Sequence, residues 1–186
     1  MKIIKIAVLI FSIVLFFSQE GWTEEIKNLI TNSSFEDVQD GKILGWRGST
    51  LSPTSDAHSG KNAAKLTLSP EQKYVGLSSQ PFKVEPGAEY YVEFWIKKDG
   101  GCRVIPMLVF WPGDYTKRKE IGMKDFPYRD EIKEYTNYLG IIKAPKDKNF
   151  VYGKFRIYMD WYGGTKSGTK SLFIDDVIVY KISKKQ

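Results

Sequence analysis

The sequence predicts an all-β protein in which two antiparallel sheets pack face to face as a β-sandwich. Apolar and polar residues alternate with a period of two in several segments, as they do on strands with one buried face. Glycines and prolines separate these segments, and no segment shows a long helical period. Many short strands without intervening helices favour an antiparallel sandwich over an α/β fold.

The expected strands follow one another along the chain with a turn signal after most of them. In chain order they are residues 62–68, 74–84, 90–97, 102–111, 135–143, 151–161 and 170–180. The turn signals are Pro70, Pro86-Gly87, Gly100-Gly101, Pro145 and Gly163-Gly164.

The segments 90–97 and 151–161 alternate most regularly, so each is expected to bury one face. The expected core positions are Tyr90, Val92, Phe94, Ile96, Phe155, Ile157, Met159 and Trp161. The expected outward positions are Tyr91, Glu93, Trp95, Lys97, Lys154, Arg156, Tyr158 and Asp160.

Residues 112–133 form the one long irregular stretch. A connection of this length exceeds an ordinary loop, which indicates a functional role, local disorder or a short helix within it. Residues 128–133 are the candidate helix.

The start of the chain is typical of a secretory signal. Lys2 and Lys5 precede an apolar run from Ile6 to Phe17, which is shorter than the roughly 20 residues that span a bilayer. We therefore expect residues 1–21 to be removed, residues 22–186 to form a single domain, and the protein to be secreted, either extracellular or periplasmic. No stable membrane span is expected after cleavage.

Charge and residue counts exclude some classes of partner and site. The net charge of +6 is mild and its positive residues are mostly scattered, so nucleic acid is a poor candidate partner for an exported chain. Cys102 is the only cysteine, so no internal disulfide can form, and a buried free thiol is the simplest interpretation. His58, the only histidine, lies in a turn-like setting and cannot build a catalytic triad alone.

Two adjacent carboxylates, Asp175 and Asp176, interrupt the last apolar strand. A carboxylate buried without a partner costs several kcal/mol, so a metal ion or a cationic side chain must compensate these charges. Calcium takes six to eight oxygen ligands, and Glu36 together with Asp175 or Asp176 could share such an ion. The alternative is that Glu36 and Asp175 pair with Lys65 or Arg47 without a metal.

Several short motifs occur in an order that resembles the jelly-roll, galactose-binding-like carbohydrate-binding modules of bacterial cellulases and xylanases. They are residues 28–36, Gly45-Trp46, residues 57–61, residues 84–90, residues 94–97 and residues 174–177. This resemblance covers nearly the whole mature chain and implies a sandwich with a structural calcium ion that joins the two chain ends. It also implies additional carbonyl ligands near Asn32, Ser34 and Lys65.

The outward aromatic and charged residues suggest a sugar-binding surface, because sugars stack on aromatic rings and need hydrogen-bonding groups around them. If the strands 90–97 and 151–161 share a sheet, one surface would combine the following predicted ligand residues: Tyr91, Glu93, Trp95, Arg156, Tyr158 and Asp160, with Trp111 and Tyr115 added from nearby. Trp46 and Trp161 are instead expected in the core, and Trp95 fits packing as well as binding.

These observations favour a secreted, non-catalytic protein that binds polysaccharide or oligosaccharide, alone or with a separate secreted enzyme or surface protein. Two alternatives stay open. One is a structural or adhesion module that binds a protein. The other is a small glycoside hydrolase or lyase in which Glu93 and Asp160 act as the two carboxylates, about 5 to 9.5 Å apart.

Overall fold

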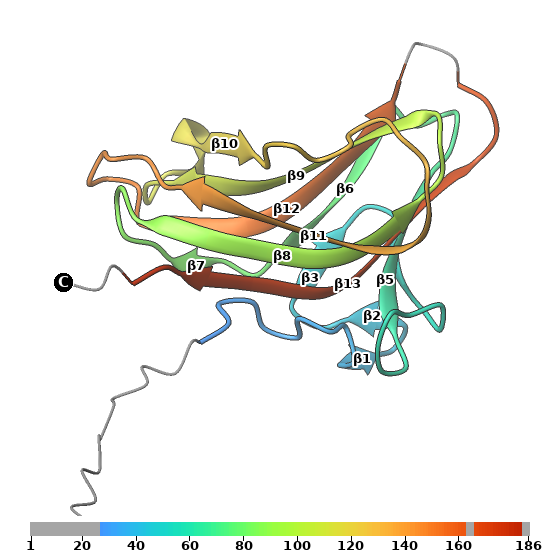
Figure 1. Cartoon of the computed structure of the whole chain (residues 1–186), viewed down its shortest axis with the longest axis horizontal. Helices are drawn as coiled ribbons and strands as arrows, with labels where there is room; N and C mark the ends of the chain where they lie inside the picture. The colour runs from blue at the N-terminus through green and yellow to red at the C-terminus, as the bar shows by residue number, and fades with distance from the viewer. Residues whose placement is uncertain (1–26, 163–165, 184–186) are drawn as a thin grey trace, which may run out of the picture.

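The computed structural model describes residues 27–162 and 166–183, and it shows two antiparallel sheets packed face to face (Figure 1). The predicted β-sandwich is therefore confirmed, whereas the predicted signal segment and its cleavage region lie outside the described residues. Within the described ranges, no helix is long and apolar enough to cross a membrane.

One sheet, called here the β12 sheet, contains the long strands β9 and β12. Its order is β10 (Lys119–Gly122), β9 (Cys102–Trp111), β12 (Tyr152–Trp161), β6 (Tyr74–Ser79) and β3 (Trp46–Gly48), and β7 (Phe82–Lys83) also pairs with β12. The predicted strand 74–84 is thus two strands, separated at Gln80-Pro81, where proline has no N–H for the ladder.

The other sheet, called here the β8 sheet, has β8 and β13 near its centre. Its order is β11 (Ile132–Lys143), β8 (Glu89–Lys98), β13 (Lys170–Lys181), β5 (Ala63–Leu68) and β4 (Leu51–Thr54). A small hairpin of β1 (Val38–Gln39) and β2 (Lys42–Ile43) precedes them.

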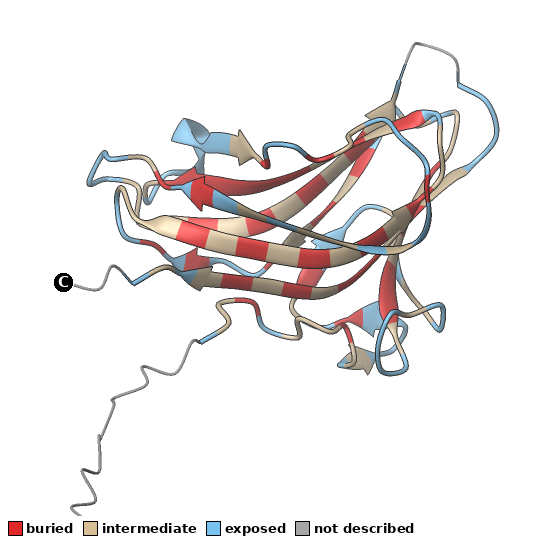
Figure 2. Ribbon diagram, in the orientation of Figure 1, coloured by how far each residue is buried: buried red, intermediate tan, exposed pale blue. Residues whose placement is uncertain are grey.

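The core lies between the two sheets and takes one side chain in two from β8 and β12, which gives the alternating colours along these strands in Figure 2. Phe94 of β8 and Phe155 of β12 meet there, with ring centroids 5.6 Å apart. Trp46 is 6% exposed and belongs to this core, as predicted. Trp161 is half-buried against it, and its indole N–H donates to the carbonyl of Gln72.

The beginning of the described chain lies beside the last strand. The N–H of Leu29 donates to the carbonyl of Val179 over 2.7 Å, and the N–H of Val177 donates to the carbonyl of Ser33. The Asn28 side chain adds hydrogen bonds to the backbone of both strand residues. The expected meeting of the two chain ends is therefore confirmed.

The long connection after β9 is more ordered than the sequence indicated. A single 3-10 turn, η1 (Tyr115–Lys117), and the edge strand β10 lie within it. The expected helix at residues 128–133 is wrong, because residues 126–131 form a loop without regular structure and β11 begins at Ile132.

Candidate functional site

The predicted ligand residues are divided between the two outer faces of the sandwich. Strand β8 carries Tyr91, Glu93 and Trp95 on one sheet, whereas β12 carries Arg156 and Tyr158 on the other. Because the core separates the two sheets, these side chains cannot form the single surface that the sequence analysis considered. Asp160 and Trp111 lie with the β12 group.

On the β8 face, Trp95 is covered by the loop before β5. The imidazole of His58 stacks on its indole with centroids 3.7 Å apart and planes 11° apart. His58 is held there because its Nδ1 lies 2.8 Å from an Asp176 carboxylate oxygen. This packing leaves that ring face of Trp95 unavailable to a sugar, and the expectation that His58 sits in a simple turn missed this contact.

The remaining polar groups of the β8 face are bound to one another. Glu93 accepts hydrogen bonds from the Tyr91 hydroxyl at 2.6 Å and from the Asn137 amide at 2.6 Å. The hydrogen bond to Glu93 raises the pKa of Tyr91 to about 12, with burial as a second cause. Tyr91 also stacks on Tyr180 with centroids 4.7 Å apart. A groove of about 590 Å³ remains at this face, lined by Asn28, Ser33, Trp95, Asp176, Ile178 and Tyr180. Among these groups, Asn28 and Asp176 already make hydrogen bonds within the protein.

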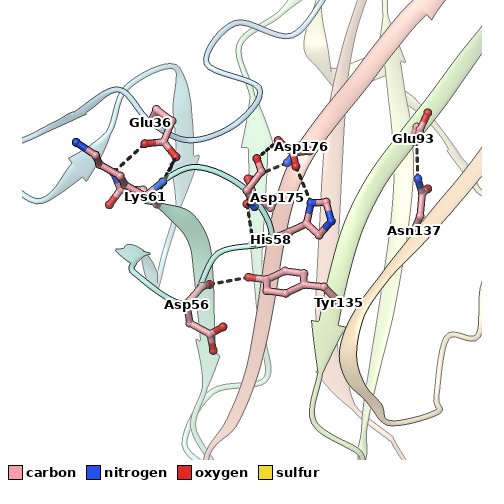
Figure 3. A network of polar contacts seen from close by, with 11 residues as sticks. Glu36, Asp56, His58, Lys61, Glu93, Tyr135, Asn137, Asp175 and Asp176 are labelled. Atoms are coloured by element: carbon pink, nitrogen blue, oxygen red, sulfur yellow. Dashed lines mark hydrogen bonds and ion pairs between the residues drawn. The ribbon is translucent and has the colours of Figure 1, made fainter.

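The carboxylates of Asp175 and Asp176 on the last strand accept hydrogen bonds from the loop before β5, which contains His58 and Ser59 (Figure 3). Asp175 is fully buried and accepts the backbone N–H groups of His58 and Ser59 at 2.9 and 3.1 Å. Its other oxygen accepts the N–H of Asp176 at 2.9 Å. Burial raises the pKa of Asp175 to about 6 despite these hydrogen bonds. Neither predicted partner, a metal ion or a cationic side chain, is needed to explain its burial.

Glu36 binds the far end of that loop. Its Oε1 accepts the N–H groups of Lys61 and Asn62 at 2.8 and 2.9 Å, and these bonds lower its pKa. Its Oε2 has one long contact, 3.4 Å from the Asn62 amide. Gly60 beside it has a φ of +63°, which side chains rarely adopt, and a Cβ there would lie 2.3 Å from Oε1 and displace the Glu36 carboxylate.

A calcium ion fits this arrangement only in part. Glu36 keeps one carboxylate oxygen with little to bind, whereas both oxygens of Asp175 accept N–H groups. Within residues 27–162 and 166–183, no three His, Cys, Asp or Glu side chains are grouped as ligands for an ion. The calcium site therefore stays a prediction, with Glu36 as its best ligand.

The β12 face is open and carries an aromatic groove. Tyr74, which is 52% exposed, stacks on Tyr158 with centroids 5.2 Å apart. Beside them Arg103 binds both carboxylate oxygens of Asp160, which raises the pKa of the guanidinium further. Arg103 and Ile105 line a groove with a volume of about 580 Å³.

The other side of this groove comes from the long connection that ends at β11. It consists of Tyr128, Arg129 and Asp130. Arg129 donates to the Tyr162 hydroxyl at 2.8 Å, and its guanidinium lies 4.1 Å from that ring centroid. None of these residues was predicted as a ligand residue, although a functional role was one of the three interpretations of the long stretch 112–133.

The opposite end of the β12 face combines rings with ammonium groups. Trp111 is buried beneath this end and stacks on Tyr152 with centroids 5.8 Å apart. Lys83 lies 4.0 Å from the Tyr152 centroid, and Lys154 lies 4.5 Å from that of Tyr115. Trp111 therefore packs beneath the surface ring of Tyr152, whereas the ammonium groups of Lys83 and Lys154 lie on the outer face.

The two carboxylates considered for glycoside hydrolysis do not face one another. Glu93 points outward from the β8 sheet and Asp160 outward from the β12 sheet, with the core between them. The hydrolase hypothesis loses this pair, because both groups must reach one glycosidic bond.

Comparison with known families decides the class of the protein. The profile of a carbohydrate binding domain family matches residues 27–158. The chain belongs to this carbohydrate-binding domain family. The resemblance inferred from the sequence motifs is therefore confirmed. No curated protein sequence matches the chain.

Solved structures with the same fold include other carbohydrate-binding domains. The CBM22-2 xylan-binding domain of Paenibacillus barcinonensis Xyn10C has 18% identity and a TM-score of 0.58, over 81% of this chain and 98% of that one. A family 16 carbohydrate-binding module-2 has 17% identity and a TM-score of 0.57, over 82% and 99%. The enzymatically active domain of bacteriophage CBA120 tailspike protein 4 has 16% identity and a TM-score of 0.60, over 83% of this chain but 21% of the tailspike chain. At these identities the similarity establishes the fold.

Proposed function

We propose that this domain is secreted and non-catalytic, and that it binds polysaccharide on the outer face of the β12 sheet. The observation that carries the proposal is the groove lined by Arg103, Ile105 and Tyr128. Next to it on β12, Tyr158 is the neighbour of Ile105 and stacks on Tyr74, and Asp160 pairs with Arg103. Tyrosine rings stack on the apolar faces of sugars. The Asp160 carboxylate can accept hydrogen bonds from sugar hydroxyl groups, and the Arg103 guanidinium can donate hydrogen bonds to them.

The opposite face is the weaker candidate, although it has rings and carboxylates as well. Its Trp95 is covered by His58, and its Glu93 is already bound by Tyr91 and Asn137. A sugar that stacks on the covered face of Trp95 or hydrogen-bonds to Glu93 would have to displace these contacts, which costs affinity.

Retention on insoluble polysaccharides tests the proposal. Xylan is the first polymer to use, because a domain with the same fold is described as xylan-binding. Tyr158→Ala should lose retention, and Tyr180→Ala, an aromatic truncation on the β8 face, is the matched control that should keep it. Equal retention of wild type and folded Tyr158→Ala would contradict the proposed site.

We also propose a calcium ion near Glu36, with a structural role. The sparsely bound Oε2 of Glu36 and the neighbouring hydrogen-bonded loop 58–62 support the proposal, since a hard cation prefers carboxylate and carbonyl oxygens. This ion would strengthen the connection of the first turns of the domain to the loop before β5, and it takes no part in sugar binding.

A further inference from the structure

We infer that the polysaccharide bound on the β12 face is acidic, with uronic acid carboxylates that contact the ammonium groups of Lys83 and Lys154. The inference rests on the proposed function, because it assigns a class of ligand to the same face.

The lysines at the Trp111 end of this face lack anionic partners. Among the described residues, neither Lys83 nor Lys154 is paired with a carboxylate, and each ammonium group lies over an aromatic ring instead. A ring attracts a cation without neutralising it, so both charges remain available to an anion.

Three lysines on and beside the β8 sheet are arranged differently. On and beside the β8 sheet, Lys97 pairs with Asp56, Lys143 with Glu89, and Lys181 with Glu85. The centre of that face carries carboxylates, Glu93 and Asp176. The ammonium groups of Lys83 and Lys154 are therefore less neutralised than those of these three lysines.

The distance between Lys154 and Tyr158 along β12 allows a single polysaccharide chain to contact both residues. Lys154 and Tyr158 are outward residues of the same strand, four positions apart, which corresponds to about 13 Å along a strand. Arg156 lies between them, 3.2 Å from the Glu120 carboxylate, which Arg118 also contacts at 3.0 Å, so this group of three charges keeps a net positive charge along the path. A polysaccharide that stacks on Tyr158 and runs along β12 would reach the ammonium group of Lys154.

Binding to pairs of polymers that differ only in charge tests the inference. The probes are glucuronoxylan and polygalacturonate, each compared with a carboxyl-reduced form in which the acid groups are converted to alcohols. Affinities are measured at low and at physiological salt for the wild type, Tyr158→Ala, and the double variant Lys83→Gln/Lys154→Gln. A second double variant, Lys65→Gln/Lys143→Gln, removes the same charge on the other sheet, where Lys65 also lies over a ring, that of Phe173.

The inference predicts that at least one acidic polymer binds more tightly than its reduced form, and that salt weakens this preference. The Lys83/Lys154 variant should lose about tenfold in affinity for the acidic polymer, as expected for two exposed ion pairs, and the control variant less than about twofold. Tyr158→Ala should weaken binding to both forms.

Other outcomes overturn either the inference or the function. Equal affinity for acidic and reduced forms, with loss only in Tyr158→Ala, would refute the acidic ligand and leave the proposed function intact. Acidic binding that does not depend on Tyr158 would also refute the inference, because the polyanion would then bind outside the groove. If the folded protein binds none of the four polymers or the insoluble polysaccharides, the proposed function itself fails.

Discussion

The imidazole of His58 lies flat on the indole of Trp95, with ring centroids 3.7 Å apart. Asp176 contacts Nδ1 at the edge of this imidazole over 2.8 Å, so three residues far apart in sequence form one packed unit. Trp95 thereby links the loop before β5 to the middle of β8. From the sequence, Trp95 fitted a role in packing as well as in sugar binding. In the structure, at least one face of its ring is used for packing.

Truncation of Trp95 should therefore affect stability more than binding. We expect Trp95→Ala to lower the free energy of unfolding by about 3 kcal/mol, because a large, half-buried ring is lost together with its stack on His58. Urea unfolding measures the change, and retention on polysaccharide should stay as in the wild type. Loss of retention in a folded Trp95→Ala protein would assign the sugar to the β8 face instead.

The Tyr91–Glu93 hydrogen bond should be visible in alkaline titration. The pKa of Tyr91 is about 12 in the folded protein against an ordinary value of 10, so the folded state holds this proton more tightly than the unfolded state. The resulting stabilisation is complete below pH 10 and is lost as the pH rises from 10 through 12.

Comparison of variants isolates this residue. In the ultraviolet phenolate titration, the difference between wild type and Tyr91→Phe should show one group with a pKa near 12. Glu93→Gln should move that group toward 10, because the hydrogen bond to the carboxylate is the largest cause of the shift. An unchanged titration in Glu93→Gln would mean that burial alone raises the pKa.

Asp175 should be important for stability even without a metal ion. Asp175→Ala would leave the N–H groups of His58, Ser59 and Asp176 without their acceptor, at an expected cost of about 3 kcal/mol in unfolding free energy. Asp175→Asn keeps one acceptor oxygen and should cost less. Urea unfolding in the presence of a chelator measures both values, and a small loss in Asp175→Ala would show that the loop finds other acceptors.

The calcium proposal predicts a higher melting temperature in calcium than in chelator, because an ion that binds only the folded state must stabilise it. Glu36→Gln should reduce this difference, while Glu134→Gln, a change at an exposed position on β11, should not. Identical melting of the wild type under both conditions would remove the site.

The strands were predictable because alternation reports which residues face the core. Segment 102–111 coincides with β9, and 151–161 begins one residue before β12. Alternation contains no information on which strands are neighbours, however, so it could not reveal that β8 and β12 lie in different sheets. The division of Tyr91 and Tyr158 between two faces follows from topology alone.

The site was only partly predictable for a related reason. Tyr158 and Asp160 were identified because they are the polar-side alternates of a regular strand. Tyr128 and Arg129 come from an irregular loop, where no period indicates the direction of a side chain. The compensation of Asp175 was also hidden, because its partners are backbone N–H groups, which every sequence possesses.

The most direct test of the central claim is a map of amide chemical-shift changes by nuclear magnetic resonance during titration with an oligosaccharide from a retained polymer. If sugar binds on the β12 face, the changes should cluster on β9, β12 and β6 and at Tyr128 and Arg129, with β8 and β13 unaffected. Changes centred on β8 and β13 around Trp95 and Tyr180 would contradict it.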